Sequence, residues 1–163
     1  MGEIRMKQFA AILAIGALVL PGIPALAQNS TKAQIFTAVE LEHQLAELAG
    51  SAKEKGSSGS TLGDYGSHAL KLSVRGASGG AEVHAHFDDV MVIEGGTATL
   101  VTGGTVIDPK TATGGETKGP GILGGVSQKI AKGDVVYVPA GTPHLLLIPK
   151  GTIFSAFVVK IHD

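Results

Sequence analysis

Two stretches hold the densest chemistry of this chain: "EVHAHFDD" at residues 82–89 and "GDVVYVPAGTPH" at residues 133–144. In an extended strand alternate side chains share a face, so Glu82, His84 and His86 are expected to point the same way. A solvated face would also accept these polar side chains. The second stretch favours a metal site instead, because its proline-rich turn ends at His144, a further nitrogen donor from a distant part of the chain.

From His68 onward the chain shows the alternation of apolar and polar residues that is typical of β-strands. In residues 68–75, Leu72 and Val74 share one face and Lys71 and Arg75 share the other, which predicts a half-buried strand. Further strands are expected at residues 81–87, 89–95, 97–104, 134–139, 144–148 and 152–161.

The composition agrees with one β-rich domain. A chain of 163 residues with 44% hydrophobic residues can bury one core. Glycine is frequent, with 24 residues, while aromatics are 4% and tryptophan is absent, so the core must consist of Val, Ile, Leu and Ala. Many short strands at regular spacing predict an all-β fold, either an antiparallel barrel or a jelly roll.

The N-terminus has the pattern of a secretory signal. Arg5 and Lys7 precede an apolar run over residues 9–20, and an Ala-x-Ala sequence ends at Ala27, so residues 1–27 are expected to be a signal peptide. A membrane anchor is the alternative, but a spanning helix needs about 20 apolar residues. Cleavage before Gln28 would leave a periplasmic or secreted protein with no membrane span.

Residues 28–67 are expected to hold one amphipathic helix and a connector, and residues 68–163 the barrel. Gly50 is a natural stop for the helix, and the glycine- and serine-rich residues 51–60 suggest a flexible connector. Residues 108–132 show little apolar periodicity and are expected to form an extended loop. The helical stripe consists of Val39, Leu41, Leu45 and Leu48.

Charge and cysteine content limit the partners. The formal net charge is -1 and charges of both signs are scattered, which argues against nucleic acid as a partner. There is no cysteine, so no disulfide can stabilise the protein outside the cytoplasm. Stability must then come from the barrel core or from a homodimer.

Taken together, the two stretches resemble the cupin superfamily, in particular its small single-domain, type-2 members. The second cupin motif runs Gly, five residues, Pro-x-Gly, two residues, His, and Ile148 stands where an Asn often closes it. The resemblance covers about residues 69–161 and implies a double-stranded β-helix, the jelly-roll barrel of the family, here with one N-terminal helix. The matching positions of the second motif are Gly133, Pro139, Gly141 and His144.

The first cupin motif departs from the family pattern, so its register decides the ligands. Counting six residues back from Gly96 places Asp89 where the family has its metal-binding Glu, and four further residues separate Asp89 from His84. His84 then takes the place of the second histidine and Glu82 that of the first. The competing register pairs His84 with His86. The favoured metal ligands are Glu82, His84, Asp89 and His144, with His86 as the alternative.

Two imidazoles with one or two carboxylates suit a single divalent transition ion, and Zn²⁺, Mn²⁺, Fe²⁺, Ni²⁺ and Cu²⁺ all fit this set. The resemblance implies an exported metal-dependent enzyme of dioxygenase, isomerase or lyase type that acts on a small molecule. The alternative is a non-catalytic cupin that binds a small molecule or a metal. A further titratable side chain aimed at the pocket would favour an enzyme, and the candidates are His68, His86 and Glu116.

Overall fold

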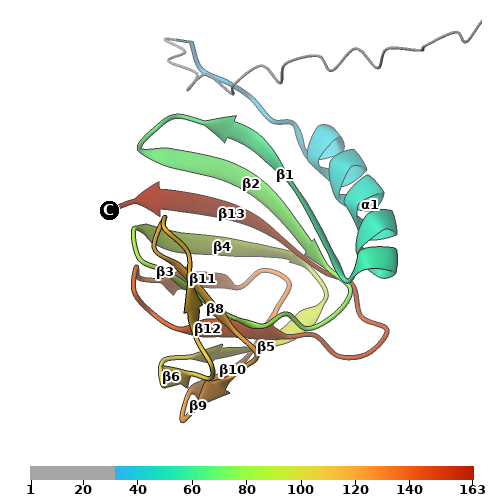
Figure 1. Cartoon of the computed structure of the whole chain (residues 1–163). Helices are drawn as coiled ribbons and strands as arrows, with labels where there is room; N and C mark the ends of the chain where they lie inside the picture. The colour runs from blue at the N-terminus through green and yellow to red at the C-terminus, as the bar shows by residue number, and fades with distance from the viewer. Residues whose placement is uncertain (1–31) are drawn as a thin grey trace, which may run out of the picture.

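The computed structural model describes residues 32–163, so the expected signal peptide lies outside the described residues. Helix α1 (Ala38–Lys55) lies beside two antiparallel sheets that curve around a common interior (Figure 1). This arrangement confirms the predicted all-β jelly-roll barrel with one N-terminal helix. Within the described residues no helix is long and apolar enough to cross a membrane.

The first sheet has five strands in the order β1-β2-β13-β4-β11, and the second has six in the order β10-β5-β12-β3-β8-β7. A small ribbon of β6 and β9 extends from the second sheet (Figure 1). The strands of the first sheet are β1 (Ser57–Asp64), β2 (His68–Arg75), β13 (Phe154–His162), β4 (Phe87–Gly95) and β11 (Val135–Val138). Those of the second are β10 (Val126–Ala131), β5 (Thr97–Thr102), β12 (His144–Leu147), β3 (Ala81–His84), β8 (Glu116–Gly119) and β7 (Lys110–Thr111), and the ribbon pairs β6 (Thr105–Val106) with β9 (Ile122–Leu123).

The helix is longer than its sequence suggests. Thr37 caps its first turn in a capping box with Glu40, but Gly50 does not stop it. A glycine inside a helix costs only about 1 kcal/mol, and the extra turn places Ala52 in a fully buried position. The helix ends at Gly56, whose φ of 85° is the left-handed conformation that glycine adopts without strain. The prediction of a stop at Gly50 is therefore wrong.

Two segments expected to be irregular are in fact paired strands. The end of the expected flexible connector belongs to β1, which pairs with β2 along its length. The expected extended loop at residues 108–132 contains β7, β8, β9 and β10. Its strands are two to six residues long and mostly exposed, so they carry little apolar alternation that a sequence could reveal.

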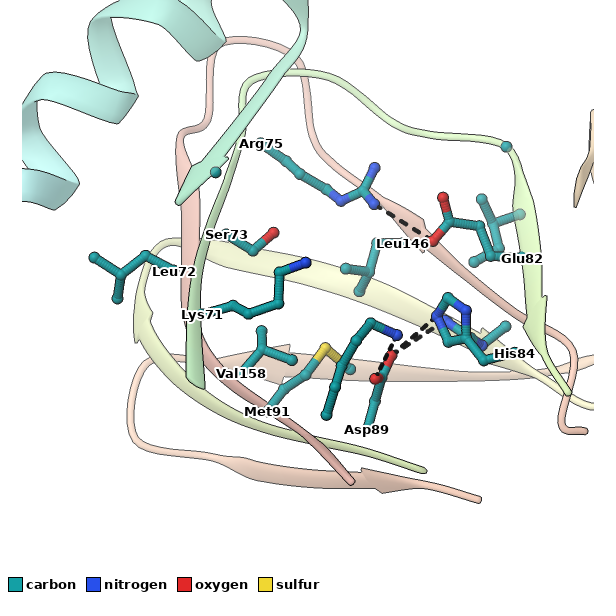
Figure 2. Close-up of a pocket in the computed structure, with 15 residues that line it drawn as sticks. Lys71, Leu72, Ser73, Arg75, Glu82, His84, Asp89, Met91, Leu146 and Val158 are labelled. Atoms are coloured by element: carbon teal, nitrogen blue, oxygen red, sulfur yellow. Dashed lines mark ion pairs between the residues drawn. The ribbon is translucent and has the colours of Figure 1, made fainter. Parts of the chain in front are cut away.

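Strand β2 turns its polar face, not its apolar one, toward the barrel interior. Leu72 and Val74 are buried on the face over which α1 lies, and Leu72 points away from the pocket in Figure 2. Lys71, Ser73 and Arg75 point into the pocket. The faces expected for this strand are thus correct, but the polar one is enclosed by the barrel because the helix needs the apolar one.

The apolar core lies between the two sheets, at one end of the barrel. Phe154 and Ile93 are each 1% exposed and are among its largest fully buried members. The tight turn between β4 and β5 depends on Gly96, which has a φ of 74° and whose Cβ, if present, would collide with the carbonyl of Ile153. The remaining core residues include Met91, Ala98, Leu100, Ile130, Val138, Leu146, Ile148, Ala156 and Val158.

Candidate metal centre

The candidate site is built from pairs of residues that lie opposite each other on neighbouring antiparallel strands. Side chains of directly opposed residues start only about 4.5 to 5.5 Å apart, so they meet without help from loops. Strand β3 joins two of these pairs because it lies between β12 and β8. The opposed pairs are Glu82 with His144, His84 with Glu116, and Asp89 with Lys160.

Two buried histidines form the centre of the site. His84 on β3 and His144 on β12 are each 7% exposed, and their ring centroids lie 5.0 Å apart. His84 Nδ1 lies 2.6 Å from Glu116 Oε2, and His144 Nδ1 lies 3.1 Å from the carbonyl oxygen of Thr142. Both acceptors favour a proton on Nδ1, which leaves the lone pair on Nε2. Metal-binding histidines are held in this way by a carboxylate or carbonyl behind the ring.

Carboxylates from two strands complete the cluster. One ligand atom each from Glu82, His84 and His144 lies within 4.8 Å of the others, which is a spacing that could hold a metal ion. Asp89 Oδ2 lies 3.2 Å from His84 Nε2 and 3.9 Å from His144 Nε2. The donor set fits a divalent transition ion, since both imidazoles present Nε2 and two carboxylates are within reach.

The structure therefore groups Glu82, His84 and His144, places Asp89 against both histidines, and leaves His86 out. Strand β3 ends at His84, and the bend at residues 85–86 turns His86 outward, where it is exposed and stacks on His162 at 6.4 Å. The expectation that His86 shares the face of His84 is wrong because the strand stops between them. His68 also lies elsewhere, stacked on Tyr65 at 5.0 Å. Of the three extra titratable candidates, only Glu116 contacts the site.

Sequence reasoning missed Lys160. Its Nζ lies 2.9 Å from Asp89 Oδ1, and apart from this ion pair neither buried atom has a hydrogen-bond partner within residues 32–163. A signal was present, because Lys160 continues the alternate residues Phe154, Ala156 and Val158 that β13 buries. A lysine at the end of an inward-facing apolar alternation indicates a charge directed into the barrel.

The electrostatics favour the metal-binding forms of His144 and Asp89, whereas the two carboxylates beside His84 favour its protonated form. Burial, opposed by the hydrogen bond to Thr142, holds the pKa of His144 below its ordinary value, so this imidazole is neutral at pH 7. Burial alone would raise the pKa of Asp89, but the contacts with His84 and Lys160 outweigh it and lower that pKa. Burial would likewise lower the pKa of His84, but its contacts with Asp89 and Glu116 raise it.

The cluster opens onto a cavity of about 250 Å³ inside the barrel. Met91, Leu146 and Val158 form an apolar floor, and the polar stripe of β2 forms one wall (Figure 2). Arg75 reaches toward Glu82, with 3.9 Å between Nη2 and Oε2 (Figure 2), and Lys160 Nζ lies 2.9 Å from Asp89 Oδ1. The cavity can therefore admit a small molecule directly to the four candidate ligands.

Comparison with known proteins finds similarity only among solved structures. No family model matches the sequence, and no curated protein matches it. Among solved structures, the cupin domain of Cnp3 from Schizosaccharomyces pombe is 14% identical, with a TM-score of 0.49 over 66% of this chain and 61% of that chain. The jelly-roll fold is shown by the two antiparallel sheets themselves.

Two enzymes show the same degree of similarity. The polyketide cyclase RemF from Streptomyces resistomycificus is 16% identical, with a TM-score of 0.47 over 66% of each chain. The DMSP lyase DddQ from Ruegeria pomeroyi is 19% identical, with a TM-score of 0.48 over 68% of this chain and 49% of that chain. The match spans less than two thirds of each of these proteins. The named activities are those of the two enzymes, and the likeness says nothing of the activity of this chain.

Proposed function

We propose that this chain is an exported metal-dependent cupin enzyme that acts on a small molecule in the barrel cavity. One divalent ion would be held by Glu82, His84, Asp89 and His144. The observation that supports this most is the orientation of the two histidines, whose Nδ1 atoms face Glu116 and the Thr142 carbonyl while their Nε2 atoms lie 3.2 and 3.9 Å from Asp89 Oδ2. An acceptor behind Nδ1 and a carboxylate beside Nε2 are the arrangement in which metal-binding histidines are held.

The ion would supply Lewis acidity or lower the pKa of a bound water. The chain's own residues prepare the site: Glu116 orients His84, and Lys160 offsets the charge of Asp89 and holds its carboxylate in place. Met91 and Val158 keep the floor of the cavity apolar. The proposal covers dioxygenase, isomerase and lyase chemistry, which share these requirements.

An enzyme is favoured over a protein that only binds a metal because polar side chains other than the candidate ligands line the cavity. Lys71 and Ser73 point into it and have no side-chain partner within residues 32–163. A protein that only stored a metal would have no use for such groups beside it. A reacting substrate needs them for orientation and proton transfer.

Elemental analysis of the purified mature protein tests the proposal. After reconstitution and dialysis we expect one divalent ion per chain in the wild type and none in His144→Ala, which should keep its strand-rich circular dichroism because the Val, Ile and Leu core does not depend on the ion. His43→Ala is the matched control, since His43 lies exposed on α1, where it forms an ion pair with Glu47 at 3.7 Å and is no part of the candidate site. A reconstituted wild type without metal would refute the proposed function, and equal metal in His144→Ala would remove that residue from the site.

Export is tested separately. The protein isolated from its native host should begin at Gln28, which intact-mass spectrometry can read directly. A mass that retains residues 1–27 would contradict export by signal cleavage.

A further inference from the structure

The inward face of β2 carries a row of cation and hydroxyl groups beside the candidate metal centre. Residues opposite each other in an antiparallel pair share a face. Lys71 lies opposite Val158, Ser73 opposite Ala156 and Arg75 opposite Phe154. Because β13 buries these three partners, the row on β2 must face the barrel interior as well, and Figure 2 shows it doing so.

The cations of this cavity are unequally neutralised. Lys160 is paired with Asp89 at 2.9 Å, and Arg75 approaches Glu82 only to 3.9 Å, which is too long for a hydrogen bond. Lys71 has no ion pair or hydrogen bond within residues 32–163. It is nevertheless half-buried, and its backbone position lies diagonally across from that of Lys160. Both lysines line the same cavity, where their positive charges repel each other and a bound anion would offset the repulsion.

The count of charges around the cavity also favours a bound anion. Three cations line the cavity or its wall, and three carboxylates oppose them when Glu116 is counted with Glu82 and Asp89. A bound divalent ion would then leave two positive charges without partners. A small anion in the cavity would neutralise them, and the guanidinium of Arg75 offers a planar pair of donors suited to carboxylate or phosphoryl oxygens.

We propose that the cavity binds a small anionic substrate whose carboxylate or phosphoryl group is held by Lys71, Ser73 and Arg75, with the rest of the molecule directed at the metal ligands. The inference rests on the proposed function, because the ion contributes to the uncompensated charge. The cavity of about 250 Å³ limits the substrate to a small organic anion and excludes a polymer.

Calorimetric titration of the zinc-loaded mature protein, from Gln28 to Asp163, tests the proposal. The probes are malonate, its neutral analogue malonamide, and inorganic phosphate. Malonate should bind at least tenfold more tightly than malonamide, and Lys71→Met should weaken malonate binding about tenfold. Lys71→Met is the informative variant because Lys71 touches none of the candidate ligands, whereas Arg75 contacts Glu82. Lys71→Arg, which keeps the charge, should restore most of the affinity.

The matched control is Lys150→Met, an exposed lysine on the turn before β13, which should leave malonate affinity unchanged. Metal content measured before and after each titration separates the two proposals: a protein that holds no zinc refutes the proposed function, whereas one that holds zinc but binds malonate and malonamide equally refutes the anion site alone. Equal malonate affinity in Lys71→Met and Lys150→Met would also overturn the inference. Tighter binding of phosphate than malonate that depends on Lys71 would support it and identify the anion as phosphoryl.

Discussion

Replacing Lys160 by methionine removes the positive charge 2.9 Å from Asp89 Oδ1 and leaves a buried carboxylate. Two unit charges at that distance attract by about 6 kcal/mol at an effective dielectric constant of about 20. Desolvation of both ions offsets part of this, and His84, 3.2 Å from Asp89 Oδ2, can take up a proton to compensate. Lys160 is also 22% exposed, so water screens the pair in part. We therefore expect a loss of about 2 to 3 kcal/mol in unfolding free energy, below the roughly 3 to 5 kcal/mol typical of breaking a fully buried pair.

Thermal melts followed by circular dichroism measure this loss. At about 3 °C per kcal/mol for a domain of this size, metal-free Lys160→Met should melt about 6 to 9 °C below the wild type. Asp89→Asn and the double variant complete a cycle that isolates the pair energy. Lys150→Met, which alters only an exposed lysine, is the control and should melt within about 2 °C of the wild type.

A bound ion should reduce the difference in melting temperature between the wild type and Lys160→Met. Saturating Zn²⁺ would place positive charge beside Asp89 and should at least halve the difference between the wild type and Lys160→Met, because the carboxylate then has another partner. If metal-free Lys160→Met has the same melting temperature as the Lys150→Met control, the ion pair does not stabilise the fold. If zinc binds and the difference persists in full, Asp89 is not next to the ion.

Three further predictions follow from other parts of the molecule. Glu82→Gln should weaken Zn²⁺ or Mn²⁺ binding at least tenfold in titrations of the metal-free protein, whereas His86→Gln should change it little, since His86 is exposed; the reverse pattern would assign the site to the other register. Contacts with Thr37 hold the pKa of Glu40 below its ordinary value, so its ionised form stabilises the helix at neutral pH; the melting temperature of the wild type should exceed that of Glu40→Gln at pH 7, and the gap should close as the pH falls through the lowered folded-state pKa. Phe154→Ala should cost about 3 to 5 kcal/mol in urea unfolding with an unchanged m-value, and a cost below about 1 kcal/mol would show that the core relaxes around the cavity.

The candidate site could be found in the sequence because its donors obey short-range rules. Glu82 and His84 are two residues apart on a strand, so they share a face wherever the strand lies. Gly96 marks the turn after the strand that carries Asp89, because a Cβ at this turn would collide with the carbonyl of Ile153. Counting back from this glycine therefore locates Asp89 in the sequence. His86 shows the limit of the same rule, since alternation says nothing about where a strand ends.

The partners of these donors could not be found in this way. Glu116 lies in a segment without apolar periodicity, and its role depends on the pairing of β8 with β3. Lys160 contacts Asp89 because β13 pairs with β4 in one particular register. Both contacts join residues far apart in the chain, and backbone pairing of this kind leaves no local mark on composition.

By itself the sequence determined the class of fold and the inventory of donors, because strand alternation, turn glycines and residue chemistry are properties of neighbours along the chain. The tertiary structure alone decided which face of each strand looks inward. On β2 the apolar face is covered by α1, so Lys71, Ser73 and Arg75 are enclosed in the barrel although they alternate like solvent-facing residues. Period-two alternation separates the two faces of a strand but is the same whichever face is buried, and only the packing of the helix makes that choice.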